Sequence, residues 1–267
     1  MRLNQYIAHS GICSRREADI IIKDGRVSVN GKIVDAPGYQ VLENDQVTVD
    51  KKKIKPEKFV YILLNKPKDY ITTTSDEKDR KTVVDIILPK LNEIPGIGKP
   101  RIYPVGRLDR NTTGLLLLTN DGDLTQQLTH PKYNIEKIYA AELSAPISIE
   151  DMEMLAEGVE LEDGFIKVDD IAYSDPRDKS KVGVAIHSGR NRIVRRLFEH
   201  IGNQVRYLDR IVFAGLTKKN LPRGSWRFLS EEEVLRLKNL NNPNKKFIPP
   251  SKTFKKNRDD GKIYRFR

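Results

Sequence analysis

The chain has 267 residues, enough for one large domain or two unequal ones with a proper core. Its formal charge is +11 and its pI is near 9.5, which indicates a polyanionic partner, either nucleic acid or an anionic membrane surface. The longest apolar run, residues 59–64, is far too short to span a bilayer, and early polar residues interrupt any signal-peptide core. One cysteine and four scattered histidines predict no internal disulfide and no metal site. We therefore expect a cytosolic, metal-free monomer without membrane association.

The excess positive charge lies at the two ends of the chain. Residues 1–58 carry 11 basic and 8 acidic side chains, whereas residues 59–240 carry 28 and 27. Residues 241–267 carry 9 basic and 2 acidic side chains. Basic arms therefore flank a nearly neutral body.

The first segment is predicted to be two helices followed by a hairpin. Apolar residues at helical spacing predict a helix that begins near Leu3 and stops near Gly11. The sequence SRRE at residues 14–17 is a capping box that opens a second helix, which Gly25 ends. Alternating apolar residues around Asn30-Gly31 then predict a β-hairpin with a tight turn.

This order of elements, with the sequence GICSRREADIIIKDGRVSVNGKIV, resembles the S4 RNA-binding module over residues 1–50. The resemblance implies that the second helix and the hairpin form one phosphate-facing surface. Taken alone, the basic residues at the helix start could equally be a solvated face. The residues that the resemblance places against RNA are Arg15, Arg16, Arg26 and Lys32.

The rest of the chain is predicted to be a charged connector, a large α+β domain and a tail. Residues 51–58, with lysines around Ile54 and Pro56, are typical of an exposed linker. Residues 59–240 alternate strand-length apolar segments with a few helical ones and show no repeat, which favours a mostly antiparallel sheet. The helical segments expected are 83–91, 124–128, 149–156, 192–201 and 231–238. Residues 241–267 have no hydrophobic period, so we expect a disordered basic arm.

The sequence GRLDRNTTGLLLLTNDG at residues 106–122 places one carboxylate, Asp109, on a loop that enters a buried strand. A carboxylate held rigidly beside a cation in a partly dry cleft stays ionised at neutral pH, which suits a nucleophile or a general base. The alternative is structural, with Asp109 capping a turn and pairing with Arg110 on the surface.

The same stretch resembles the catalytic motif of pseudouridine synthases, in particular the RsuA/RluB/RluF branch that modifies ribosomal RNA and carries an N-terminal S4 module. Other parts of that family's pattern follow in order. They are LLNKP at 63–67, KIY at 137–139, GRNRIVRR at 189–196 and LPRGSWRFLSEEEV at 221–234. The resemblance covers nearly everything except the tail.

The resemblance implies three catalytic residues. Asp109 matches the essential aspartate, Tyr139 the tyrosine on which the target base stacks, and Arg195 the arginine that pairs with the aspartate. Leu216 matches an apolar pocket residue less cleanly. The further substrate-binding residues implied are Arg107, Asn65, Lys66, Arg190, Asn191, Arg192 and Arg196. No cofactor is implied.

The expected activity is therefore an isomerisation of uridine to pseudouridine in ribosomal RNA, with closer similarity to large-subunit than to small-subunit enzymes. Two alternatives stay open, namely the same chemistry on small-subunit RNA and a ribosome-assembly protein that binds RNA without turnover. The aspartate could attack the sugar C1′ or abstract a sugar proton to give a glycal. The acidic stretch 150–178 is expected to face away from RNA.

Overall fold

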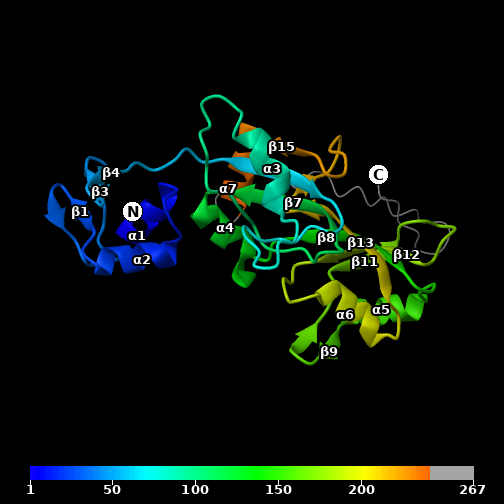
Figure 1. The fold of residues 1–267 in the computed structure, drawn as a ribbon. Helices are drawn as coiled ribbons and strands as arrows, with labels where there is room; N and C mark the ends of the chain where they lie inside the picture. Colours follow the sequence, from blue (N-terminus) through cyan, green and yellow to red (C-terminus); the bar gives the residue numbers. More distant parts are fainter. Residues whose placement is uncertain (241–267) are drawn as a thin grey trace. The chain divides into compact units, whose positions relative to one another are not determined.

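The computed structural model describes residues 1–240, and it divides the chain into two compact units (Figure 1). The first unit contains residues 1–60 and 90–102, and the second contains residues 61–89 and 103–240. The predicted basic tail, 241–267, lies outside the described residues. Within residues 1–240, no helix is long and apolar enough to cross a membrane.

The first unit contains the predicted helix pair and hairpin. Helix α1 spans Leu3–His9 and α2 spans Arg15–Lys23, and Ser14 and Glu17 form a complete capping box at the start of α2. Strands β1 (Val27–Val29) and β2 (Lys32–Ile33) are joined through Asn30 and Gly31, which both have positive φ as a tight hairpin turn requires. Strands β3 (Val47–Val49) and β4 (Lys52–Lys53) complete a sheet of order β2-β1-β3-β4.

The segment expected as an exposed connector, residues 51–58, is partly folded into this unit. Lys52 and Lys53 form β4 and pair with β3, and the Ile54 side chain is 8% exposed within the core of the unit. The two lysines of β4 are exposed, so the strand contributes its backbone and Ile54 rather than an apolar face. The lysine-rich composition conceals this strand because its stabilising groups are main-chain amides and one isoleucine.

The second unit is built on one large sheet with the order β11-β12-β8-β13-β7-β5-β15 (Figure 1). All its neighbouring strands are antiparallel except β13 and β7, which are parallel. Its strands are β5 (Tyr61–Lys66), β6 (Tyr103–Pro104), β7 (Thr113–Thr119), β8 (Lys137–Leu143), β11 (Asp170–Tyr173), β12 (Lys181–Ile186), β13 (Val205–Phe213), β14 (Leu216–Thr217) and β15 (Trp226–Phe228). A separate hairpin joins β9 (Val159–Leu161) to β10 (Gly164–Ile166). The predicted α+β class with a mostly antiparallel sheet is confirmed.

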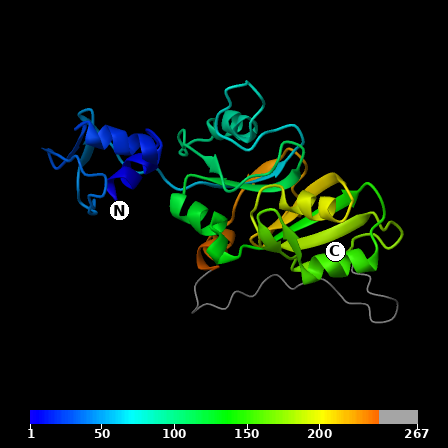
Figure 2. The same ribbon diagram turned by 90° about the horizontal axis from the view of Figure 1, so that it is seen from below.

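The helices fall within a few residues of the predicted segments. They are α3 (Val83–Leu91), α4 (Gly122–Thr129), α5 (Ile149–Glu157), α6 (Ile193–His200) and α7 (Glu231–Asn239), with a short 3₁₀ turn η1 (Pro131–Tyr133). Helices α4 and α7 lie side by side, and Leu124, Leu128 and Leu237 share one core cluster (Figure 2).

Strand β7 is the centre of the core, because all of its residues are buried. Successive side chains of a strand point to opposite faces, so Leu115 and Leu117 enter the cluster with α4 and α7 while Leu116 and Leu118 fill the opposite face. At the far end of the strand, Asp121 caps α4 by accepting from the Leu124 amide. The loop that precedes β7 is therefore attached to the most rigid strand of the unit.

Candidate active site

Asp109 lies on the loop 105–112, directly before β7, and its side chain is 34% exposed. Its Oδ2 lies 3.7 Å from Arg192 Nη1 and 3.8 Å from Arg195 Nε. Arg110, the alternative partner, instead pairs with Asp69 at 3.3 Å. The carboxylate is thus held by two guanidinium groups from the start of α6 rather than by its sequence neighbour.

The main chain around Asp109 is fixed by the segment that follows β5. The Lys66 ammonium donates to the carbonyl oxygens of Asp109, Arg110 and Thr112 at 2.8–3.1 Å, and also to that of Pro67. Thr72 Oγ1 donates to the Leu108 carbonyl and accepts from the Leu108 amide. Burial lowers the pKa of Lys66 to about 8, against the opposing effect of Asp109 and Asp69.

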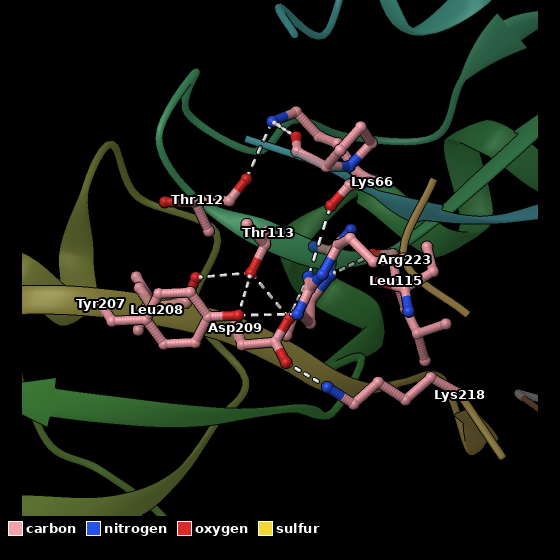
Figure 3. A network of polar contacts seen from close by, with 12 residues as sticks. Lys66, Thr112, Thr113, Leu115, Tyr207, Leu208, Asp209, Lys218 and Arg223 are labelled. Atoms are coloured by element: carbon pink, nitrogen blue, oxygen red, sulfur yellow. Dashed lines mark hydrogen bonds and ion pairs between the residues drawn. The ribbon is translucent and has the colours of Figure 1, made fainter. Parts of the chain in front are cut away.

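A second polar cluster fixes the start of β7 from the opposite side (Figure 3). Asp209, on β13, is 3% exposed and accepts from Thr113 Oγ1, Arg223 Nη1 and Lys218 Nζ. Burial raises the pKa of Asp209, but hydrogen bonds from Arg223, Lys218 and Thr113 outweigh it and hold the pKa below its ordinary value. Thr113, which lies four residues after Asp109 in the chain, is thereby hydrogen-bonded to β13.

Two cavities meet at Asp109. A cavity of about 360 Å³ is lined by Asp109 together with Tyr139 and Arg195. A larger one of about 920 Å³ is lined by Asp109, by Arg195 and by the segment 71–76. Tyr139 lies on β8 and is 8% exposed. The arrangement brings a carboxylate, an aromatic ring and a guanidinium to one hollow of roughly nucleoside size.

Of the further predicted substrate-binding residues, four line the smaller cavity. They are Arg107, Arg190, Asn191 and Arg192. Arg190 also donates to the carbonyl oxygens of Gly164 and Phe165, so part of its role is to hold the β9–β10 hairpin.

The other four lie away from both cavities. Asn65 is buried and donates to the Leu221 carbonyl. Lys66 is buried and donates to main-chain carbonyl oxygens of the loop that carries Asp109. Leu216 belongs to the core cluster with Phe213, which itself lines the cavity. Arg196 forms a bidentate pair with Asp163. A motif match identifies such residues without distinguishing those that face the cavity from those that support it.

The structure also places in the smaller cavity three residues that were not among the expected site residues. Lys137 and Arg210 line it from β8 and β13, and His187 lines it while its Nδ1 lies 2.7 Å from Asp169 Oδ2. For Lys137 a signal was present, because residues two apart on a strand share a face and Tyr139 is a site residue. For Arg210 there was none, since the β8–β13 pairing is not readable from sequence.

The acidic stretch 150–178 does not lie wholly away from the basic side chains. Asp163 pairs with Arg196 at 2.7 Å and with Arg190 at 3.5 Å, and Asp169 orients His187 at the cavity. These two carboxylates therefore order the basic surface beside the site. Which way the rest of the acidic stretch faces relative to RNA stays a prediction.

In the first unit, all four predicted RNA-binding residues are exposed. Arg15 and Arg16 begin α2, and Lys32 lies on β2. Arg26, although 48% exposed, also forms a bidentate pair with Asp50, with the shorter distance at 2.6 Å.

Both units match families of known proteins. The first unit matches the S4 domain over residues 1–47, and the second matches a family of RNA-modifying enzymes. That family is the RNA pseudouridylate synthases, matched over residues 60–200, and the chain belongs to it. The protein is thus a pseudouridine synthase, an isomerase, with an N-terminal S4 domain.

Individual relatives agree with this assignment. The chain is 43% identical to the ribosomal large subunit pseudouridine synthase B of Bacillus subtilis (strain 168), over 90% of this chain and 96% of that one. It is 34% identical to the dual-specificity RNA pseudouridine synthase RluF of Escherichia coli (strain K12), over 94% and 83% of the respective chains. A crystal structure of a pseudouridylate synthase is similar with a TM-score of 0.61 and 28% identity, over 89% of this chain and 99% of that chain.

Proposed function

We propose that this protein converts a specific uridine of large-subunit ribosomal RNA to pseudouridine, with Asp109 as the reacting carboxylate. The observation that carries the proposal is the meeting of Asp109, Tyr139 and Arg195 in one cavity of about 360 Å³. The name and the 43% identity of the Bacillus subtilis relative support the choice of the large-subunit RNA.

The reaction is an isomerisation, so the residues of the chain have to handle only one base and one sugar. The C1′–N1 bond breaks, the base turns, and a C1′–C5 bond forms, while C5 loses a proton and N1 gains one. An ionised Asp109 either attacks C1′ or removes a proton from the sugar, and both routes require a carboxylate that carries its charge at the start. Arg192 and Arg195 each lie within 3.8 Å of its Oδ2, where they can pair with the carboxylate.

The uridine has to leave its stack to reach Asp109, which costs a few kcal/mol. Stacking on the ring of Tyr139 offsets part of this cost, and phosphate contacts by exposed arginines such as Arg107 and Arg192 offset more. Asp109 is one-third exposed, so bound RNA is what excludes water from the sugar intermediate.

The test is turnover on unmodified large-subunit ribosomal RNA without added cofactor, with pseudouridine mapped after the reaction. Asp109→Asn keeps the shape of the side chain and removes its charge, so we expect kcat to fall by at least ~10³-fold while RNA affinity is largely retained. Retained turnover in this variant would refute the role of Asp109. Product formed only in small-subunit RNA would change the target, and tight binding with no product in any RNA would favour a non-catalytic assembly protein.

A further inference from the structure

Two cations face the smaller cavity from beneath the position proposed for the base. Lys137 lies two residues before Tyr139 on β8, so both side chains leave the same face of the strand. Arg210 lies on β13 directly opposite Tyr139 in the strand register. All three residues line the cavity of about 360 Å³.

Arg210 is buried, and not all of its N–H groups have acceptors among residues 1–240. Its side chain is among the largest fully buried ones, and the residue is 2% exposed. Its Nε donates to the Leu115 carbonyl and its guanidinium lies 4.5 Å from the Phe213 ring centre. Its Nη2, however, is buried without an acceptor, and no carboxylate of residues 1–240 forms an ion pair with it. The neighbouring Asp209 is already paired with Lys218 and Arg223.

An unpaired buried donor on a charged group is costly, because the water it would bind in the unfolded chain is not replaced by another acceptor. Nη2 is closed off from the cavity, but Arg210 lines it and the N–H groups of Nη1 have no acceptor among residues 1–240, so these are the donors that a ligand in the cavity can reach.

Lys137 is arranged in the same way. Its Nζ donates to the carbonyl oxygens of Ile135 at 2.8 Å and His187 at 2.9 Å. An ammonium has three N–H groups, so one is left without an acceptor in the part of the chain that the structure describes. Burial, and then the charge of Arg210, lower the pKa of Lys137 to about 8, while Asp169 opposes this. The two cations are therefore held close enough to repel each other.

The ligand that fits these donors is flat, largely apolar and provided with oxygen acceptors at its edge. Leu128, Ile135 and Phe213 give the cavity apolar walls beside the Tyr139 ring, which suits a pyrimidine better than a phosphate. Uracil offers two carbonyl acceptors, O2 and O4, whereas cytosine carries an amino donor in place of O4.

We propose that Lys137 and Arg210 donate hydrogen bonds to the carbonyl oxygens of the everted uracil and so select uracil over cytosine. The proposal rests on the proposed function and adds to it two residues that determine specificity at the base.

The test uses one substrate RNA in three forms, with the target base as uracil, 2-thiouracil or 4-thiouracil. Sulfur is a much weaker acceptor than oxygen, so the wild type should lose about 10-fold or more in kcat/KM for the analogue whose oxygen is contacted. Lys137→Met and Arg210→Lys should show a comparable decrease on the uracil substrate. On the thio substrate that lacks the oxygen they contact, each variant should then show a much smaller further decrease.

Matched controls separate base recognition from general damage. Lys181→Met and Arg227→Lys change the same residue types on β12 and β15, outside both cavities, where the cations pair with Asp178 and Glu233. They should keep the wild-type ratio between uracil and its thio analogues. Melting temperatures identify any variant that fails to fold. If Arg210→Lys fails to fold, Lys137→Met still tests the proposal.

Three outcomes would overturn the inference. The wild type could treat all three bases alike, which would exclude these hydrogen bonds. The variants could lose activity equally on all three substrates and keep the wild-type discrimination, which would assign the residues to structure or to phosphate binding. A wild type that forms no pseudouridine in any RNA would remove the proposed function itself, whereas the first two outcomes would leave it standing.

Discussion

At the residue scale, Lys66 shows how a buried cation can serve a loop without touching substrate. Its ammonium donates to four carbonyl oxygens, three of them in the loop that carries Asp109. Lys66→Met keeps the length of the side chain and leaves those carbonyl oxygens without their donor. We expect the free energy of unfolding to fall by about 3 kcal/mol, and kcat to fall more than KM rises because Asp109 loses its position.

Urea unfolding and steady-state kinetics check this expectation. Lys181→Met, which removes an exposed strand lysine, is the control and should change stability by no more than about 0.5 kcal/mol. A Lys66→Met protein with wild-type stability and kcat would show that the four hydrogen bonds do not hold the loop.

The burial of Lys66 and Lys137 predicts opposite pH trends for activity and stability. The pKa values of Lys66 and Lys137 are both lowered from 10.5 to about 8 by burial. Above pH 8 each folded lysine releases a proton that the unfolded chain still binds, so these two groups make the free energy of unfolding rise between about pH 8 and 10. Activity should fall over the same window, because the amines have one N–H fewer and no charge.

Initial rates and melting temperatures between about pH 7 and 9.5 test this pair of trends. Lys137→Arg keeps the charge above pH 8 and should reduce the decrease in activity on the alkaline side. A decrease in activity that simply follows the unfolding of the protein would contradict the assignment.

At the scale of elements, the close approach of β7 and β13 depends on Gly114. This residue has φ +104°, and an added Cβ would collide with the main-chain nitrogen and oxygen of Arg210 and with the Asp209 carboxylate. Gly114→Ala therefore has to push the two strands apart, which should cost at least ~2 kcal/mol. Because the strands carry the Asp109 loop and Arg210, activity should fall with stability.

Thermal unfolding followed by circular dichroism measures the effect. Gly38→Ala is a suitable control, since nothing lies within 4 Å of the added Cβ and its φ is not in the left-handed region. Equal melting temperatures for the two variants would mean that the strands can separate at no cost.

The elements themselves were largely predictable, whereas their pairing was not. The capping box at Ser14, the turn at Asn30-Gly31 and the buried leucines of β7 each act over a few residues, so local sequence is sufficient to find them. The parallel pairing of β13 with β7, and the cluster around Asp209, join residues that are 96 positions apart in the chain. No local pattern encodes such a pairing, so Arg210 and the supporting role of Lys66 became visible only in the fold.

At the scale of the whole molecule, we expect the first unit to set the affinity for RNA and the second unit to carry out the reaction. The first unit has a net charge of +3 over residues 1–58, and its exposed cations include those on α2, β2 and β4. Residues 59–240, which include most of the second unit, have nearly balanced charge, and the second unit contains Asp109, the carboxylate proposed to react. Substitutions in the first unit should therefore change how tightly RNA is bound and leave the chemical step unchanged.

The triple variant Arg15→Ala/Arg16→Ala/Lys32→Ala tests this division directly. Removing a cation that binds a phosphate lowers the salt dependence of binding, so the slope of log affinity against log salt should decrease by about 2. At saturating RNA, kcat should equal that of the wild type, because none of the three residues lines a cavity with Asp109. The control Arg177→Ala/Lys179→Ala/Lys181→Ala removes the same charge from the turn that leads from β11 into β12, and it should change the slope much less. An equal change in both variants would mean that net charge, rather than the S4 surface, sets RNA affinity, and a lower kcat at saturation would couple the first unit to the chemistry.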